Sequence, residues 1–289
     1  MSIYRMIAMV AFVLFAPLLG GLLDGMDRKI SARMQGRRGP SILQPFYDVI
    51  KLMQKKLLVV NSSQYFMIVS YLFFVIFTGT LFFGGFDLLL CFFSLTTAAM
   101  FFVLGACSTH SPYSSMGAQR ELLQMMAYEP MVLMTAVGFY LATGTFDVYR
   151  IIQMDASPIL RLPGFFIGFV FILSIKMRKS PFDLSTSHHA HQEMVKGITT
   201  EMVGKIYAMI EIAEWYENVF LLGVVGLFFV NSSLWSVALA VGMCAVVFFI
   251  EIFVDNVNAR FKWDKMLGWA WGVTLLTGGI NLFILQLLR

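Results

Sequence analysis

The chain consists largely of long apolar runs separated by short polar segments. Each run is long enough, or nearly so, to cross roughly 30 Å of hydrocarbon at about 1.5 Å per helical residue. The fourth and fifth runs are short, and tilting or local thinning of the bilayer would accommodate them. The pattern predicts an all-α, polytopic integral membrane protein with about eight transmembrane helices, near residues 4–25, 65–83, 87–107, 130–146, 162–178, 206–230, 234–255 and 266–288.

The composition agrees with this pattern. Hydrophobic residues make up 58% of the chain and charged residues 13%, whereas soluble domains average roughly 45–50% apolar and about 25% charged residues. The connections are too short for a soluble domain, so we expect residues 1–289 to form a single membrane domain. The first run is too long for a signal peptide and has no small-residue cleavage site, so we expect it to be retained.

The three cysteines oppose a metal or cluster site built by this chain. Cys91, Cys107 and Cys244 stand in apolar surroundings without C-x-x-C spacing, unlike zinc or iron–sulfur ligands. We therefore expect no cofactor in this chain.

The basic residues predict the orientation. Seventeen of the 21 Lys and Arg lie in or beside four alternate connections, and such an excess marks the cytoplasmic side. We expect a multi-pass protein of the cytoplasmic membrane with both termini outside. Its inner loops, which would form the interface to soluble subunits, are residues 26–64, 108–129, 179–205 and 256–265.

Two inner segments have helical periodicity of their own. Residues 114–127 resemble a short inner helix, and residues 41–57 predict an amphipathic helix at the membrane surface or beneath a partner, with an apolar face of Ile42, Phe46, Val49, Ile50 and Met53. The outer connections at 84–86 and 231–233 are expected to be tight turns. No internal repeat is found, which opposes a stand-alone secondary ion transporter.

Carboxylates accompany the inner ends of several predicted helices. Glu211, Glu214 and Glu217 stand at i, i+3 steps, so neighbouring members can meet along one side of a helix. Only about 18 Å of apolar helix follows them, which is too short to span the hydrocarbon, so they are expected inside the membrane. Other acids lie at the inner ends of predicted helices. Asp24 ends the first helix, Glu129 begins the fourth helix just before Pro130, and Glu251 and Asp255 lie near the inner end of the seventh helix.

Acids at membrane depth indicate an ion pathway. Apart from Arg5 and Asp87 at their outermost ends, the outer halves of the predicted helices contain no Asp, Glu, Lys, Arg or His, so we expect an inner half-channel that leaves sideways into a neighbouring subunit. Alternatively, the acids pair with the many nearby Lys and Arg. The H-H-A-H cluster, His188, His189 and His191, is compatible with a metal site, with surface histidines, or with proton acceptors at a vestibule.

Two stretches resemble one family closely. G-R-R-G-P-S-I-L-Q-P-F-Y-D-V-I-K-L (36–52) and P-F-D-L…Q-E-M-V-K-G-I-T-T-E (181–201) are similar to the two signatures of the subunit 1 family of respiratory complex I. That family includes the membrane subunits of energy-converting group 4 [NiFe] hydrogenases. The eight-helix plan matches it too.

The resemblance implies roles for individual residues. Glu193 and Glu201 match loop acids of the family, while Glu129, Glu214 and Glu251 fall where it places membrane acids of an inner-half proton channel. These acids and those expected inside the membrane together make up the expected ion pathway: Glu129, Glu193, Glu201, Glu211, Glu214, Glu217, Glu251 and Asp255. Arg37, Gln44 and Asp48 match the loop that contacts the soluble arm, and the expected interface is Arg37, Arg38, Gln44, Asp48, Pro181, Asp183, His188, His189 and His191.

One departure from the family favours its hydrogenase branch. The quinone branch follows P-F-D-L with an acidic run, whereas this chain has S-T-S-H-H-A-H at 185–191, which resembles Ech-type hydrogenase membrane subunits. The resemblance implies a non-catalytic membrane anchor and ion-coupling subunit. Its implied partners are hydrogenase large and small subunits with a NiFe centre and iron–sulfur clusters, an iron–sulfur subunit, an antiporter-like subunit and, through the complex, ferredoxin. No nucleic-acid partner is expected. The alternatives are a quinone-site subunit of NADH-quinone oxidoreductase and a secondary ion transporter.

Overall fold

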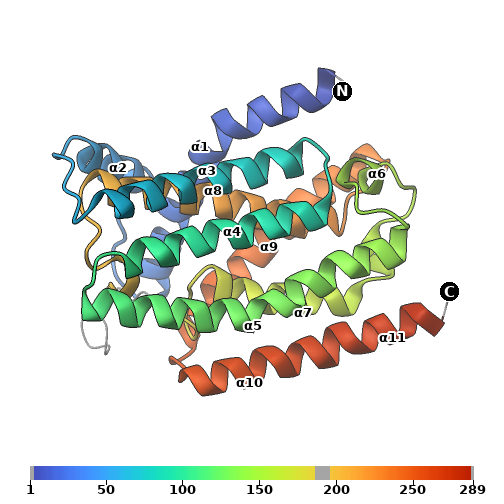
Figure 1. Cartoon of the computed structure of the whole chain (residues 1–289). Helices are drawn as coiled ribbons and strands as arrows, with labels where there is room; N and C mark the ends of the chain where they lie inside the picture. The colour runs from blue at the N-terminus through green and yellow to red at the C-terminus, as the bar shows by residue number, and fades with distance from the viewer. Residues whose placement is uncertain (1–2, 186–195, 288–289) are drawn as a thin grey trace.

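The computed structural model describes residues 3–185 and 196–287, and this part of the chain is helical with no β-strand. Figure 1 shows the main helices running alongside one another in a bundle. Their bounds are α1 Ile3–Met34, α2 Gln44–Met53, α3 Ser62–Phe83, α4 Leu88–Cys107, α5 Pro112–Thr143, α6 Val148–Ile152, α7 Pro163–Lys176, α8 Lys205–Leu227, α9 Leu234–Val257, α10 Trp263–Val273 and α11 Ile280–Leu287.

The helices confirm the predicted polytopic fold. Within the described residues, six helical segments have the length and hydropathy to cross a membrane: α1, α3, α4, α5, α9 and the continuous segment Trp263–Leu287. The other two predicted spans are also helices. They are α7, which is apolar but short, and α8, which has a spanning length but carries three glutamates.

Two predicted helix ends are wrong. The segment 114–127 and the run from residue 130 form one 32-residue helix, α5, with Pro130 inside it, so Glu129 lies within the helix rather than at its start. Likewise α1 continues past Asp24 to Met34. A proline stops most helices in water, but neighbouring helices in a membrane bundle can satisfy the backbone group that it frees. Asp24 interrupts only the apolar run and not the helix, and its carboxylate pairs with Arg28 one turn later.

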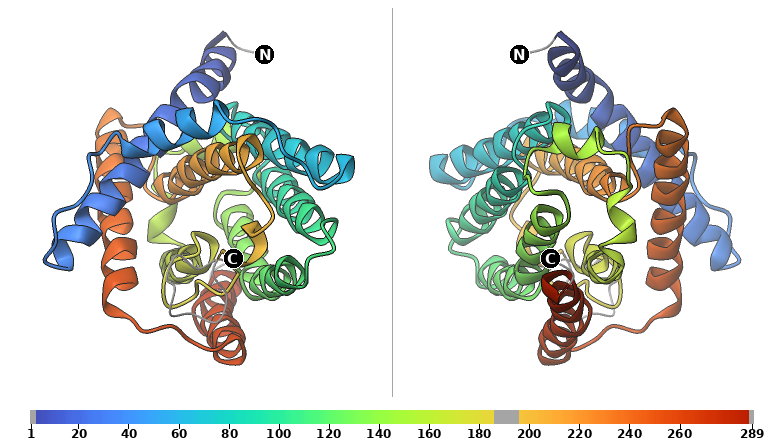
Figure 2. Two further views of the ribbon diagram at one scale, coloured as in Figure 1. Left: turned by 90° about the vertical axis from the view of Figure 1, so that its left-hand side faces the viewer. Right: turned by 90° about the vertical axis from the view of Figure 1, so that its right-hand side faces the viewer.

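The connections gather at two ends of the bundle. We call the α2 end the one formed by α2 and by residues 35–43, 54–61, 177–185 and 196–204. It lies at the left of Figure 1 and faces the viewer in the left panel of Figure 2. At the other end, residues 84–87 and 228–233 form short turns, as predicted. Next to the α2 end, Gly117 of α5 touches the backbone of Ile198, and a Cβ there would collide with it. The 3-10 turn at 197–199 therefore lies directly against α5.

The continuous helical segment Trp263–Leu287 caps the start of α7 through one side chain. This segment contains a π-helical stretch, Thr274–Gly279, followed by the buried Asn281. Asn281 Oδ1 accepts hydrogen bonds from the amides of Gly164 (2.8 Å) and Phe165 (3.3 Å), and its Nδ2 donates to the Arg161 carbonyl (3.0 Å). These amides would otherwise be unsatisfied at the helix start. A residue 117 positions away in the sequence therefore caps α7 and fixes where it begins.

Candidate functional site

Arg178 lies just after α7 and binds two carboxylates from different helices. Its Nη2 and Nε donate to Glu121 of α5 at 3.0 and 3.2 Å, and its Nη1 donates to Glu214 of α8 at 2.6 Å. The guanidinium also stands 4.9 Å from the centre of the Phe102 ring. Arg178 has a positive φ of 51°, an uncommon conformation for a non-glycine residue that the surrounding contacts must hold in place.

Lys176, the last residue of α7, makes the second set of contacts. Its Nζ lies 2.8 Å from Glu217 Oε1 and donates to the Tyr128 hydroxyl at 3.1 Å. The Tyr71 hydroxyl donates to the other Glu217 oxygen at 3.3 Å. Glu217 and Lys176 are both buried, with side-chain exposures of 10% and 8%. We call Glu121, Lys176, Arg178, Glu214 and Glu217 the buried charge array.

The buried charge array joins α5, α7 and α8 through alternating charges. The Arg178 guanidinium lies between the carboxylates of Glu121 and Glu214, and Lys176 faces Glu217. Three carboxylates face two cations, so the array has one acid more than its basic groups neutralise. Glu214 and Glu217 are therefore paired with nearby basic residues, as the alternative interpretation of the acids expects. Glu214 pairs with Arg178, and Glu217 pairs with Lys176.

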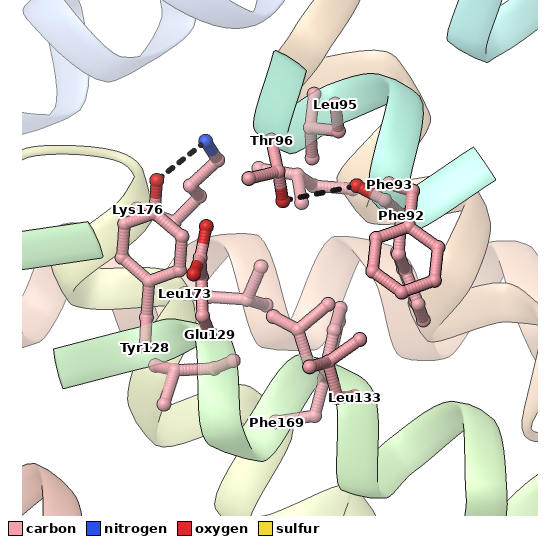
Figure 3. Close-up of a pocket in the computed structure, with 13 residues that line it drawn as sticks. Phe92, Phe93, Leu95, Thr96, Tyr128, Glu129, Leu133, Phe169, Leu173 and Lys176 are labelled. Atoms are coloured by element: carbon pink, nitrogen blue, oxygen red, sulfur yellow. Dashed lines mark hydrogen bonds between the residues drawn. The ribbon is translucent and has the colours of Figure 1, made fainter. Parts of the chain in front are cut away.

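Glu129 borders a small cavity beside this array. The cavity has a volume of about 60 Å³ and lies between α4, α5 and α7, with Lys176, Tyr128 and Thr96 also in its wall. In Figure 3 the Glu129 carboxylate points into the space between Lys176 and Thr96. Its Oε1 is buried and has no hydrogen-bond partner among the described residues. Most of the cavity wall is apolar, and Thr96, Tyr128, Glu129 and Lys176 supply the polar groups that a water molecule there would need as partners.

A second cluster of charges joins α1 and α9 to the segment after α7. Lys179 Nζ lies 2.7 Å from Asp27 Oδ2, and the Ser180 amide donates to Asp255 Oδ1 at 2.8 Å. One turn before Asp255, Glu251 is 1% exposed, and its Oε2 has no hydrogen-bond partner in the described part of the chain. The predicted pair on α9 therefore lies against residues 179–180.

A third cluster lies between α1, α2 and α8. Arg28 donates to both oxygens of Asp24, at 3.1 and 2.9 Å, and to Asp48 of α2 at 3.0 Å. Gln44 donates to the other Asp48 oxygen at 3.0 Å. Glu211 interacts electrostatically with Arg28 and hydrogen-bonds with the Tyr207 side chain. Asp48 is thus bonded to α1 of the bundle through Arg28, and Gln44 is bonded to Asp48.

The remaining predicted residues lie at the α2 end. Pro181 accepts a hydrogen bond from the Phe261 amide at 2.9 Å, and Asp183 forms an ion pair with Arg260 at 3.5 Å. The Glu201 carbonyl accepts from Gln64. Arg37 and Arg38 are exposed. His188, His189, His191 and Glu193 lie outside the described residues, among which no group of three or more His, Cys, Asp or Glu is placed to hold a metal ion.

Three members of the buried charge array were not predicted as site residues. Lys176 and Arg178 contributed only to the predicted orientation, and Glu121 fell in the predicted short inner helix 114–127. One signal was available: only thirteen residues of α7 precede Lys176, about 20 Å of helix, so a lysine there must lie within membrane depth. Nothing in the sequence pairs Glu121 with Arg178, because this contact joins residues 57 positions apart.

The fold and these clusters define a polytopic membrane protein with paired charges buried near one end. The family model described as NADH dehydrogenase matches residues 6–286. The chain therefore belongs to the NADH dehydrogenase family, as the two sequence signatures predicted.

Relatives come from both branches of the predicted resemblance. The chain is 27% identical to an NADH-quinone oxidoreductase subunit of Syntrophotalea carbinolica, over 89% of this chain and 88% of the relative. It is 30% identical to Hydrogenase-4 component C of Escherichia coli, over 73% and 70%. The chain is thus a membrane subunit of the complex I-like and Ech-like kind.

A solved structure shares the fold. A chain of the membrane-bound sulfane sulfur reductase, an archaeal respiratory membrane complex, matches with a TM-score of 0.87 over 97% of this chain and 99% of that one, at 24% identity.

Proposed function

We propose that this protein is the membrane anchor and ion-coupling subunit of an energy-converting [NiFe] hydrogenase. In that complex, oxidation of reduced ferredoxin and formation of hydrogen would be linked to movement of protons or sodium ions across the cell membrane. The similarity to Hydrogenase-4 component C and the S-T-S-H-H-A-H stretch support this branch. The large and small hydrogenase subunits, an iron–sulfur subunit and an antiporter-like subunit would be its partners. The NiFe centre and the clusters would belong to those soluble subunits.

The observation that carries the proposal is the short segment from Lys176 to Ser180. Within five residues it contacts acids on four helices: Glu217 and Glu214 on α8, Glu121 on α5, Asp27 on α1 and Asp255 on α9. The same segment begins the connection 177–204 at the α2 end. A displacement of this connection would therefore change several buried ion pairs at once.

The coupling follows from these contacts. If electron transfer in the soluble arm moves the 177–204 connection, Arg178 shifts relative to Glu214 and Lys176 shifts relative to Glu217. Each carboxylate then loses its counter-charge, which favours its protonated form, most strongly at Glu217, the more buried of the two. Returning the cations reverses the change. The protein would thus convert a movement at its surface into uptake and release of protons on α8.

The path beyond α8 leads to the side of the protein. In the described residues, the half of the bundle away from the α2 end offers no comparable buried charge cluster, whereas Glu129 borders a cavity next to Lys176. The rim of this cavity includes Phe93 and Leu133, which are 52% and 36% exposed. An ion leaving Glu129 would pass to a neighbouring membrane subunit at this surface.

The test is ion uptake by inverted membrane vesicles that contain the intact complex. We expect Glu214→Gln to leave assembly and ferredoxin-dependent hydrogen formation in place while strongly lowering proton or sodium uptake, because glutamine keeps a hydrogen bond to Arg178 but cannot ionise. Asp264→Asn, at an exposed position outside the expected ion pathway, serves as the control for loss of one carboxylate. Unchanged uptake in the Glu214 variant would count against the proposal.

A quinone-reducing complex is the second candidate, supported by the similarity to the NADH-quinone oxidoreductase subunit of Syntrophotalea carbinolica. Purification of the complex with its subunits decides between them. A NiFe large subunit and cluster-bearing partners support the hydrogenase, whereas quinone-dependent activity supports the alternative. Ion transport by the purified chain alone would instead indicate a secondary transporter.

A further inference from the structure

A basic and apolar strip runs along the α2 end, from the last turn of α2 to the start of α3. It consists of Lys51, Lys55 and Lys56, followed by Leu57, Leu58, Val59 and Val60, and every one of these residues is exposed. Leu58 and Val60 are 62% and 55% exposed. We call these seven residues the basic strip. Four consecutive exposed aliphatic residues next to lysines are costly in water and need an apolar partner.

The start of α3 fixes the depth of the basic strip. This helix begins at Ser62, directly after the strip, and its 22 residues are about as long as the hydrocarbon is thick. Asn61 caps it by accepting from the Gln64 amide at 2.7 Å, and the Lys56 carbonyl lies beside Gly204 at the start of α8. The strip is therefore held where the chain enters the bilayer, at the level of the lipid headgroups.

The surface of α2 has the pattern of a helix that lies along this boundary. Figure 2 shows α2 lying across the end of the bundle. Phe46 and Val49 pack on α8, around Trp215 and Ala208. The rest of its surface divides into a stripe of exposed apolar residues (Leu43, Tyr47 and Ile50) and, about a quarter turn away, a polar stripe (Gln44, Asp48 and Lys51). One side can thus face acyl chains while the other faces headgroups.

The lysines of the basic strip are available to a ligand. None of the three forms an ion pair or a side-chain hydrogen bond with any residue in the described part of the chain, unlike Arg28, Lys176, Arg178 and Lys179. An ammonium beside aliphatic side chains matches a phospholipid, whose phosphate meets the charge while its acyl chains cover the apolar residues. We propose that the basic strip binds the headgroups of anionic phospholipids in the leaflet at the α2 end.

This lipid site goes beyond the proposed function and does not depend on it. The test uses the intact complex purified in detergent, with phosphatidylglycerol as the titrated probe and native mass spectrometry to count bound lipid. We expect Lys55→Gln/Lys56→Gln to weaken the tightest phosphatidylglycerol binding by roughly fivefold for each lysine removed. Phosphatidylcholine binding should not change. Lys262→Gln/Lys265→Gln, which removes two exposed lysines from another connection at this end, is the matched control and should keep the affinity of the unmodified complex.

The expected binding also depends on ionic strength, because exposed charges are screened within a few ångströms at molar salt. Equal loss in the two double variants would overturn the site, since any two positive charges would then serve. Displacement of the lipid by inorganic phosphate beyond the effect of chloride at equal ionic strength would identify a free-phosphate site instead. Cross-linking of Leu58→Cys to a soluble subunit in the complex would show that a protein covers the strip, and would likewise refute the proposal.

Discussion

Replacing Arg178 with glutamine tests the buried charge array most directly. The substitution removes the charge that faces Glu121 and Glu214 and leaves a shorter, neutral amide side chain. Glu121 is the more vulnerable partner because its side chain is only 5% exposed and receives two hydrogen bonds from Arg178. The Glu214 side chain is 36% exposed, so water can compensate for part of its loss.

The expected magnitude follows from this difference in burial. Removing one partner of a buried ion pair costs about 3–5 kcal/mol, because the other charge remains buried and uncompensated. We assign most of that loss to Glu121. The double variant Arg178→Gln/Glu121→Gln removes both charges, so its loss should be smaller than that of Arg178→Gln alone.

The assay is thermal unfolding followed by a thiol-reactive fluorophore, which reports when the buried Cys91 becomes accessible. The exposed Cys107 is first replaced by serine in all variants to lower the background. A double-mutant cycle then gives the coupling energy between Arg178 and Glu121. If the two single effects simply add, Arg178 does not neutralise Glu121, and the description of the array is wrong.

Two further predictions concern the surface and the fold. Arg37→Ala/Asp48→Ala should weaken retention of the soluble subunits on washed membranes, because it removes an exposed cation and a carboxylate of α2 at the α2 end. Full retention would remove these residues from the proposed interface. Asn281→Ala should destabilise the protein by roughly 0.5–2 kcal/mol, the usual effect of losing a helix cap. Asn281→Asp keeps the acceptor oxygen and should be less destabilising. No change in thermal unfolding for Asn281→Ala would show that the amides of α7 have other acceptors.

The sequence predicted the spans because hydrophobic length is a local property. The predicted span at 206–230 also put Glu211, Glu214 and Glu217 on one helix, as α8 confirms. The errors have equally local causes. Pro130 is a usual helix start and Asp24 ends an apolar run, so the predicted helices begin or end there, although α5 and α1 continue through both positions.

The pairing of charges could not be predicted in this way. Arg178 meets Glu121 and Glu214 across 57 and 36 positions, and several cations and acids at the α2 end would have been equally plausible partners. Only the packing of α5, α7 and α8 selects among them. The sequence indicated that acids lie within the membrane, and the structure shows which side chains neutralise them.

The cap that Asn281 provides for α7 has a consequence for how the protein is made. During synthesis the start of α7 enters the membrane well before residue 281 leaves the ribosome, so the amides of Gly164 and Phe165 first have no acceptor from the last helix. Unpaired amides are costly in hydrocarbon. Membrane insertion of α7 should therefore be completed late, when the final helix docks, and the depth of Lys176 is set only at that step.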